Sequence, residues 1–243
     1  MGQIIAIVSG KGGAGKSTIA CALGAALARR GKRVLCVDFD AGLRSLDIML
    51  GIDSSVVYDL SDLLEKGCDW KQVLYRCEHQ QGLYALPAPS RADFVFSLPE
   101  VRRVMLEAAS VFDYVLADSP AGLGNGFTAS AIAASTVLVV ATADPVCVRD
   151  ARKVSDMLFS MNKENVRLVV NRMKKRFFQK GLMSDLDQVI DLSGLQLISV
   201  VPDWPDVALH IMNGQLKGKN SPFFKEIEAL AARIEGEEIS LHL

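Results

Sequence analysis

Short apolar runs alternate along the chain with longer stretches whose apolar positions recur every three or four residues. A short apolar run between polar boundaries is typical of a strand buried on both faces, and the longer stretches are typical of helices that pack on one side. This alternation predicts an α/β fold with a doubly wound, mostly parallel sheet and helices on both faces. The predicted strands are 3–9, 33–38, 114–118, 137–142, 166–171 and 196–201.

Several predicted helices have recognisable ends. The first is predicted over 17–30 and ends at Gly31, because glycine readily adopts the left-handed conformation that closes a helix. Ser97 is the expected N-cap of a later helix, and 58–77 predicts two short helices. The last predicted helix begins at Pro222 and packs one apolar face on the core. That face consists of Phe223, Phe224, Ile227, Leu230, Ala231 and Ile234.

Composition favours one large domain over residues 1–243. Half of the 243 residues are hydrophobic, which is enough for a sizeable core, and no change in composition indicates a linker. The formal net charge of −1 gives no bulk attraction to nucleic acid or to a membrane. No signal peptide or membrane-spanning apolar segment is apparent, so the expected location is the cytoplasm.

The spacing of the cysteines argues against one class of function. The chain has five, and no two of them have the Cys-x-x-Cys spacing of a metal or redox site. We therefore expect reduced, buried thiols rather than disulfides. Iron–sulfur proteins need paired cluster cysteines, so this class is excluded.

The turn between the first strand and the first helix has the pattern of a phosphate-binding loop. Its glycines allow successive backbone N–H groups to converge on phosphate oxygens at the start of a helix. The lysine of such a loop reaches the β- and γ-phosphates, and the following hydroxyl binds Mg²⁺. The residues concerned are Gly10, Lys11, Gly12, Gly13, Ala14, Gly15, Lys16, Ser17 and Thr18.

A second lysine inside the loop makes it more distinctive. With Lys11 the segment reads Lys-Gly-Gly-x-Gly-Lys-Ser, which resembles the MinD/ParA family of deviant Walker A P-loop ATPases. Two further segments are similar to the MinD branch, Asp-Phe-Asp-Ala-Gly-Leu-Arg at 38–44 and Asp-Ser-Pro-Ala-Gly at 118–122. The resemblance extends over about 3–234, and an acidic tail, 235–243, departs from it.

The resemblance implies ATP and Mg²⁺ as cofactors and assigns roles around the phosphates. Lys16, Ser17 and the loop amides hold phosphate and metal, and Lys11 reaches the partner's nucleotide across a dimer. Asp40 positions or activates the attacking water, and Asp38 and Asp118 support the metal, as carboxylates at strand ends do. On the alternative interpretation, the aspartates after the second strand are turn or cap residues and Lys11 is a solvated cation.

Other positions receive roles from the same resemblance. Ser45 stands where the family pattern has Asn, and a shorter hydroxyl there alters a switch contact. Gly122, with Gly124 and Gly126, lets the loop after 114–118 move as a second switch, and Asp150 is placed at a dimer face. The base site is assigned to Asn171, Arg172, Pro202 and Asp203.

The function implied is a MinD-type ATPase that hydrolyses ATP to ADP and phosphate. It would act as an ATP-dependent homodimerisation switch in septum placement, with an activator and an effector from the division machinery. The alternatives are a ParA-like partition ATPase on nonspecific DNA and a flagellar-placement or cargo-positioning relative.

Two segments bear on where the protein docks. The basic and aromatic run 174–180 suits anionic lipid or DNA phosphate, or is a solvated loop. The tail lacks an amphipathic membrane anchor, and its acidic side chains would be repelled by an anionic bilayer. The sequence is therefore compatible with docking on a membrane, on DNA or on a protein. A location peripheral to the inner face of the membrane is one of these alternatives.

Overall fold

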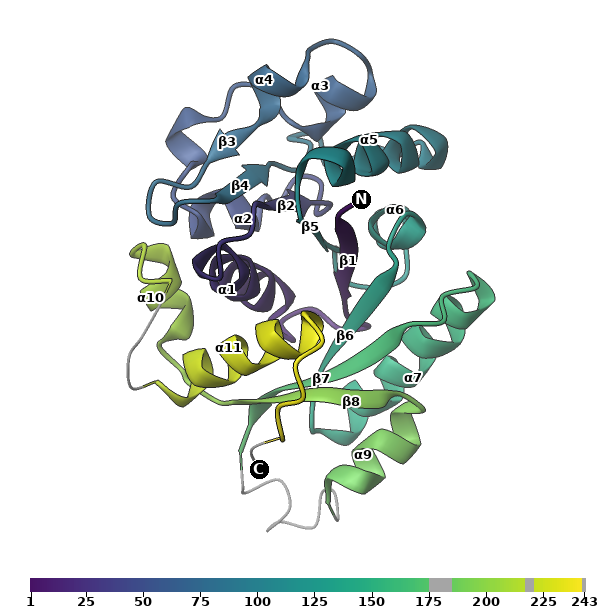
Figure 1. Ribbon diagram of the computed structural model, residues 1–243. Helices are drawn as coiled ribbons and strands as arrows, with labels where there is room; N and C mark the ends of the chain where they lie inside the picture. Colours follow the sequence, from purple (N-terminus) through teal and green to yellow (C-terminus); the bar gives the residue numbers. More distant parts are fainter. Residues whose placement is uncertain (175–184, 217–220, 242–243) are drawn as a thin grey trace.

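The computed structural model describes residues 1–174, 185–216 and 221–241. At its centre lies an eight-stranded sheet in the order β3-β4-β2-β5-β1-β6-β7-β8 (Figure 1). Every pairing is parallel except that of β3 with β4. The strands are β1 (Gln3–Val8), β2 (Val34–Asp38), β3 (Tyr75–Arg76), β4 (Leu83–Leu86), β5 (Tyr114–Asp118), β6 (Thr136–Thr142), β7 (Val166–Met173) and β8 (Gln196–Pro202).

Helices cover both faces of the sheet (Figure 1). One face packs against α1 (Lys16–Arg29), α2 (Ser45–Met49), α10 (Val207–Met212) and α11 (Pro222–Ile234). The other packs against α3 (Leu60–Leu64), α4 (Trp70–Val73), α5 (Leu98–Val111), α6 (Asn125–Ile132), α7 (Pro145–Ser160) and α9 (Leu186–Ser193). The predicted doubly wound, mostly parallel architecture is confirmed.

Strand β1 shows why the central strands are continuously apolar. Ile5 and Ile7 point to the face covered by α1, while Ile4, Ala6 and Val8 point to the opposite face. Because side chains alternate between the faces and both faces are covered, every position after Gln3 is buried.

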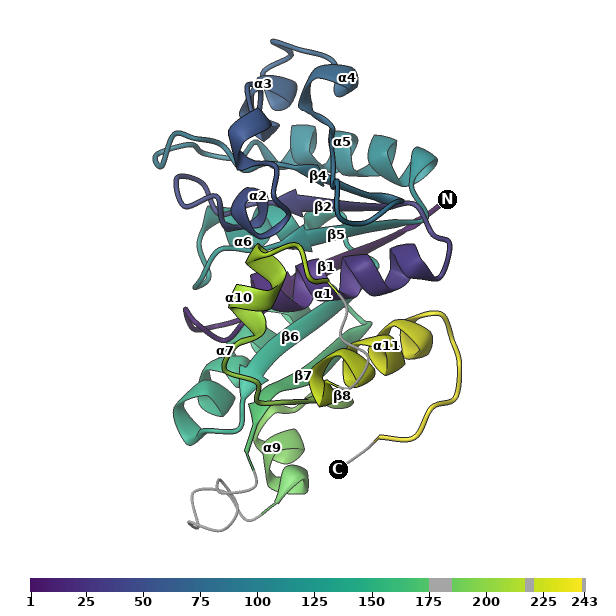
Figure 2. The same cartoon turned by 90° about the vertical axis from the view of Figure 1, so that its left-hand side faces the viewer.

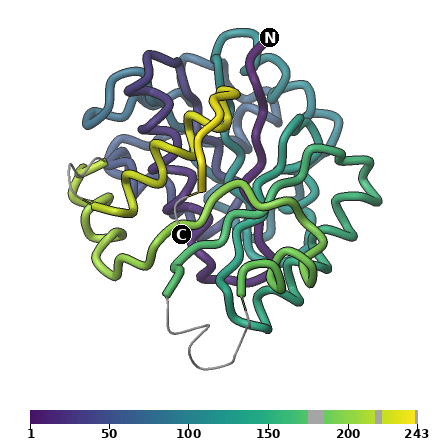
Figure 3. The backbone as a smooth tube through the Cα atoms, turned by 60° about the horizontal axis from the view of Figure 1, so that its bottom comes forward, coloured from purple at the N-terminus to yellow at the C-terminus, as the bar shows by residue number. Residues whose placement is uncertain are grey.

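Helix α1 lies close to the sheet because of its small residues. A Cβ on Gly24 would lie 3.0 Å from Cys36 Sγ and 3.0 Å from a methyl carbon of Leu83. On its outer side α1 packs against α11, so the first and last helices of the chain lie side by side (Figure 3). Most of α1 is therefore buried, between the sheet on one side and α11 on the other.

The structure refines several local predictions. Gly31 has φ +83°, as the predicted end of the first helix requires. Ser97 occupies the predicted N-cap position of α5, although its side chain makes no capping hydrogen bond. Strand β3 was not predicted, because a two-residue edge strand has no periodicity to detect.

The acidic tail folds back onto the edge of the sheet where the parallel strands begin (Figure 2). Arg30 pairs with Glu235 and Glu237, and Lys32 lies 3.0 Å from Glu235. Arg233 also donates to the backbone carbonyls of residues 239 and 240. These five contacts, three ion pairs and two hydrogen bonds to backbone carbonyls, hold the tail beside α1 and α11.

Two further sequence expectations can be compared with the described residues. No helix among them is both long and apolar enough to cross a bilayer. All five cysteines are free thiols, and four of them are buried.

A buried ion pair within α11 also hydrogen-bonds to β8, and we expect its loss to be strongly destabilising. Arg233 Nη1 lies 2.8 Å from Glu226 and 3.0 Å from the carbonyl of Ile198, and Glu226 also accepts from Ser199 at 2.7 Å. Arg233→Ala leaves a buried carboxylate unpaired, which should reduce the free energy of unfolding by about 3–5 kcal/mol. Chemical denaturation measures this change.

The matched control is Arg103→Ala, which removes an exposed arginine paired with Glu100 and Glu107 on α5. Exposed pairs contribute little, so this variant should lose less than about 1 kcal/mol. Equal losses in the two variants would show that burial of the α11 pair is not what stabilises it.

Candidate functional site

The glycine-rich loop connects the end of β1 to the start of α1, as predicted. Gly13 has φ +79° and Gly15 has φ +96°, a conformation that side chains rarely tolerate. Ser9 Oγ donates to the carbonyl of Lys11 at 2.8 Å, which tightens the first turn. The loop therefore lies directly before the N-terminus of α1, where an anion binds favourably.

Asn171 holds the loop from the side of β7. Its Nδ2 donates to the carbonyl of Ala14 at 2.8 Å, and its Oδ1 accepts from the N–H of Arg172 at 2.9 Å. A Cβ on Gly15 would lie only 2.3 Å from the same Nδ2, so glycine is required there on steric grounds as well. Asn171, which is predicted at the base edge, therefore supports the phosphate loop through a direct hydrogen bond.

Two aspartates are buried side by side beneath the loop. Asp38 ends β2 and Asp118 ends β5, and the two are direct neighbours in the parallel register. Both are fully buried, and neither carboxylate oxygen of Asp118 has a hydrogen-bond partner among the described residues. Burial raises the pKa of Asp118 well above its usual range, the charge of Asp38 adds to that rise, and the Ser17 hydroxyl and Lys16 oppose it.

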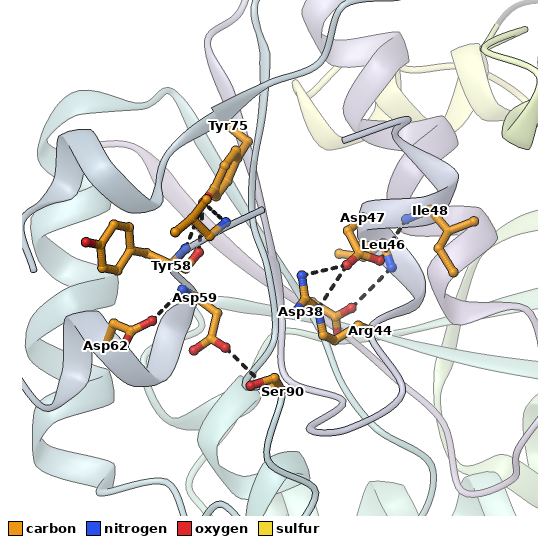
Figure 4. A network of polar contacts seen from close by, with 11 residues as sticks. Asp38, Arg44, Leu46, Asp47, Ile48, Tyr58, Asp59, Asp62, Tyr75 and Ser90 are labelled. Atoms are coloured by element: carbon orange, nitrogen blue, oxygen red, sulfur yellow. Dashed lines mark hydrogen bonds and ion pairs between the residues drawn. The ribbon is translucent and has the colours of Figure 1, made fainter. Parts of the chain in front are cut away.

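Asp38 also organises the segment that follows it. One of its carboxylate oxygens accepts from the backbone N–H of Asp40 at 2.8 Å. The other accepts from the N–H of Leu46 at 3.1 Å (Figure 4). Burial raises the pKa of Asp38 to about 7, against these two hydrogen bonds, which lower it. Asp40 is partly buried, and desolvation raises the pKa of its carboxyl group while the nearby Lys16 lowers it.

The loop after Asp40 is braced by a second polar network. The N–H of Gly42 donates to the carbonyl of Pro89 at 2.9 Å, and the next residue, Ser90, donates its N–H to Asp59 at 2.9 Å (Figure 4). Asp59 is in turn the N-cap of α3, where it forms a reciprocal capping box with Asp62. The loop that carries Asp40 is therefore connected to the outlying helix α3.

The donor set fits Mg²⁺ better than a metal held by protein alone. Among the described residues, no group of three or more His, Cys, Asp or Glu side chains could hold a metal ion. Mg²⁺ usually takes one or two carboxylates or hydroxyls and completes its shell with water and phosphate oxygens. The Ser17 hydroxyl, the Asp38 carboxylate and the unpartnered oxygens of Asp118 provide such a set.

Two adjoining cavities match the two ends of a nucleotide. One, of about 420 Å³, is lined by the loop residues Gly12 to Thr18 that face it and by Asp40, Ser45 and Ala121. The other, of about 300 Å³, is lined by Asn171, Arg172, Pro202 and Asp203. Gly15, Thr18 and Arg172 line both cavities, so phosphates in the first and a base in the second would belong to one ligand.

The second cavity contains the predicted base residues and several that sequence reasoning missed. Arg172 is held with φ +54°, which is unusual for a residue with a side chain. Asp203 pairs with Lys174 at 2.8 Å. The missed lining residues are Trp204, Pro205, Val207, Ala208 and Phe223. Phe223 is predicted as a core residue. Trp204 could have been predicted because it is an aromatic residue directly after Pro202-Asp203.

The glycines after β5 have different roles from one another. Gly122 has φ +85° and open space around it, as a movable loop allows. Gly126 is different, because a Cβ there would lie 2.7 Å from Pro120 and 3.0 Å from the carbonyl of Phe39. The prediction that all three glycines give this loop freedom is therefore wrong at Gly126, where glycine allows close packing.

Asp150 lies beside the start of the phosphate loop. A Cβ on Gly10 would lie 2.9 Å from the Cβ of Asp150, so α7 touches the loop directly. Lys11, the next residue, is exposed, whereas Lys16 is buried. The two lysines of the loop therefore occupy different environments, with Lys16 inside the site and Lys11 on its outer surface.

The buried carboxylates predict a pH dependence of stability. Between the ordinary value of 3.8 and a pKa of about 7, folded Asp38 keeps a proton that the unfolded chain has released. The free energy of unfolding of the ligand-free protein should therefore fall as pH rises from about 5 to about 8. Asp118→Asn removes one of the two buried carboxyl groups that titrate, so it should flatten the pH dependence of stability.

Thermal denaturation at pH 6 and pH 8 measures both effects. The control is Asp53→Asn, which removes an exposed carboxylate from the turn after α2. This variant should keep the wild-type pH dependence. A wild-type protein that gains stability on going from pH 6 to pH 8 would contradict the argument.

Comparisons with known proteins agree with this site. Residues 5–217 match the CobQ/CobB/MinD/ParA nucleotide binding domain. The septum site-determining protein MinD of Thermotoga maritima is 36% identical, over 99% of this chain and 91% of its own length. The MinD of Bacillus subtilis is also 36% identical, over 100% of this chain and 92% of its own.

A solved structure gives the same result in three dimensions. The MinC:MinD cell division protein complex of Aquifex aeolicus superimposes with a TM-score of 0.90 at 32% identity, covering 99% of each chain. The match extends from the phosphate loop through the strands that carry the buried carboxylates. The chain therefore belongs to the MinD branch of the CobQ/CobB/MinD/ParA nucleotide-binding family.

Proposed function

We propose that the protein is a Mg²⁺-dependent ATPase that alternates between a monomer and an ATP-bound homodimer and acts in placing the division septum. The observation that carries this proposal is the different placement of the two loop lysines. Lys16 is buried against the phosphate cavity and Lys11 is exposed beside it. One lysine therefore suits the chain's own nucleotide, and the other suits a nucleotide held by a second copy.

Within one copy, the loop amides and Lys16 bind the phosphates. Ser17, Asp38 and Asp118 are the residues that would hold Mg²⁺, which supplies positive charge against the phosphate oxygens. Asn171, Arg172, Pro202 and Asp203 surround the base. These assignments rest on the lining of the two adjoining cavities and on the unpartnered carboxylate of Asp118.

Asp40 is the group we assign to orienting the attacking water. It lines the phosphate cavity, and it is held near the metal-site residues by the hydrogen bond from its N–H to Asp38. Its raised pKa makes the carboxylate a better proton acceptor than an exposed aspartate. Negative charge that develops on the phosphate is opposed by Lys16 in the same copy and by Lys11 from the other.

An exposed apolar rim supports pairing of two copies at this edge. We use the name apolar rim for Leu43, Ile48, Leu123, Val146 and Met212, which are exposed and lie on segments at the carboxyl ends of the strands. Three of them, Leu43, Ile48 and Met212, line the phosphate cavity itself. Exposed apolar side chains gathered around a charged site are typical of an interface. Gly122 and Asp150 border the same surface and are assigned to the switch and to the dimer face.

The cellular role rests on the relatives. Those that match over nearly the whole chain are septum site-determining proteins, and one solved relative is a complex with the cell division protein MinC. We therefore propose a cytoplasmic protein with partners from the division machinery. The tail at 235–241 is acidic, and its glutamates pair with Arg30 and Lys32 beside α1.

Partition on DNA is the alternative function. It depends on the basic run 174–180, most of which lies outside the described residues. Lys174 is described, and it is paired with Asp203 rather than free for phosphate. This pairing favours the MinD-type function over DNA binding.

Asp40→Ala should separate binding from hydrolysis. Loss of the water-orienting carboxylate should reduce the rate of ATP hydrolysis about 100-fold or more, while ATP binding is retained. The variant should therefore accumulate as a dimer with ATP and Mg²⁺ and remain a monomer with ADP, as measured by light scattering.

Lys11→Ala provides the comparison, since it should bind ADP normally and fail to dimerise with ATP. Liposomes of anionic lipid and nonspecific DNA, added separately to the Asp40→Ala dimer, distinguish the alternatives. Binding to DNA alone would favour a partition ATPase. A monomer under every condition would overturn the proposed switch.

A charge on the apolar rim should prevent pairing. Leu43→Glu places a carboxylate on the most exposed rim residue, which is 74% exposed, so the monomer should fold normally. The variant should lose the ATP-dependent dimer in light scattering. Val111→Glu is the control, because Val111 is 54% exposed at the opposite edge of the sheet, at the end of α5. Loss of the dimer in both variants would contradict a specific interface at the rim.

A further inference from the structure

Ser45 makes a direct contact with the hydroxyl that we assign to the metal. Ser45 is the first residue of α2, and its Oγ donates to Ser17 Oγ at 3.1 Å. Ser17 is the second residue of α1. This hydrogen bond therefore connects α2 to the phosphate loop at the oxygen nearest the expected cation.

The backbone around Ser45 is fixed from both sides. Asp38 accepts the N–H of Leu46 at 3.1 Å, directly after Ser45. Before it, Arg44 adopts φ +48°, and its guanidinium pairs with the buried Asp47 at 2.9 Å (Figure 4). A strained residue held by a buried ion pair requires support from its surroundings. These contacts give Ser45 a defined direction toward Ser17.

A hydroxyl at this position can serve both states of the site. Serine is a donor and an acceptor, so Ser45 can donate to Ser17 when no cation is present. When Ser17 Oγ faces a cation with its lone pairs, its hydrogen points away and needs an acceptor, which Ser45 Oγ can provide. Partners of this kind orient a metal ligand and strengthen its binding.

We propose that Ser45 is a positioning residue that orients the Ser17 hydroxyl toward Mg²⁺ and makes the placement of α2 depend on metal binding. The inference rests on the proposed nucleotide site and goes beyond it. Helix α2 carries Ile48, and Leu43 precedes it, so two members of the apolar rim belong to the segment that Ser45 attaches to the phosphate loop. Occupation of the metal site is thereby connected to the surface proposed for pairing.

The test compares Ser45→Ala with Ser45→Asn. Alanine removes the partner of Ser17, whereas the amide oxygen of asparagine can still accept its hydrogen. Titration of Mg²⁺ into protein saturated with ADP should show at least about a 10-fold weaker affinity in Ser45→Ala and near wild-type affinity in Ser45→Asn. ADP affinity in the presence of a chelator should be unchanged in both variants. Ser54→Ala, in the exposed turn after α2, is the control and should match the wild type.

Hydrogen exchange provides a readout that does not depend on catalysis. In the wild type with ADP, Mg²⁺ should slow exchange of the amides of α2, and this protection should be lost in Ser45→Ala alone. Wild-type Mg²⁺ affinity in Ser45→Ala would overturn the role of Ser45. The role of Ser45 would also be overturned if Ser45→Ala lost Mg²⁺ affinity and ADP affinity in the presence of chelator to the same extent. Equal losses indicate a general structural defect. If wild-type ADP binding itself does not respond to Mg²⁺, the proposed function fails, and this inference fails with it.

Discussion

The structure depends on an electrostatic constraint at the ends of two neighbouring strands. The parallel register of β2 and β5 places Asp38 and Asp118 side by side in a region without solvent. Two carboxylates so close cannot both ionise favourably unless a cation lies between or above them. The fold therefore keeps a site that is electrostatically unfavourable when empty, and the glycine-rich loop with Lys16 covers it. A cation bound beside the two carboxylates would relieve this unfavourable arrangement.

One carboxylate has several tasks in this arrangement. Asp38 belongs to the expected metal site, and it also accepts the N–H groups of Asp40 and Leu46. Asp40, the start of α2 and the proposed metal site are thus connected through the single side chain of Asp38. Asn171 also has more than one contact of this kind. It lines the second cavity, and its amide donates to the carbonyl of Ala14 in the phosphate loop. Asp38 therefore organises the segment after β2, and Asn171 from β7 fixes the phosphate loop.

Features encoded in contiguous residues could be predicted from the sequence. The loop between β1 and α1, the acidic ends of β2 and β5 and the apolar face of α11 all have local patterns, and the structure confirms each. Features created by contacts between distant segments could not. The second task of Asn171 needs the carbonyl of Ala14, 157 positions away.

The same limit explains the remaining differences. The packing role of Gly126 depends on Pro120 and on the carbonyl of Phe39, which no pattern around Gly126 reveals. Trp204 enters the base cavity because it packs against Phe224 and His210, with ring centroids 5.7 and 4.4 Å away. In the sequence, Ser45 is only a departure from a family pattern. The fold brings it within hydrogen-bond distance of Ser17.

Both described ends of the chain lie at the edge of the sheet where the parallel strands begin (Figure 2). Gly2 is bonded there to the carbonyl of Ala109, and the tail is held there by Arg30 and Arg233. Fluorescent proteins, affinity tags or surface tethers joined at either end would therefore leave Lys11 and the apolar rim unobstructed. In a pair of copies that meet at their rims, such labels would point outward at opposite extremes of the assembly. Probes intended to report contact between copies belong on the carboxyl edge instead.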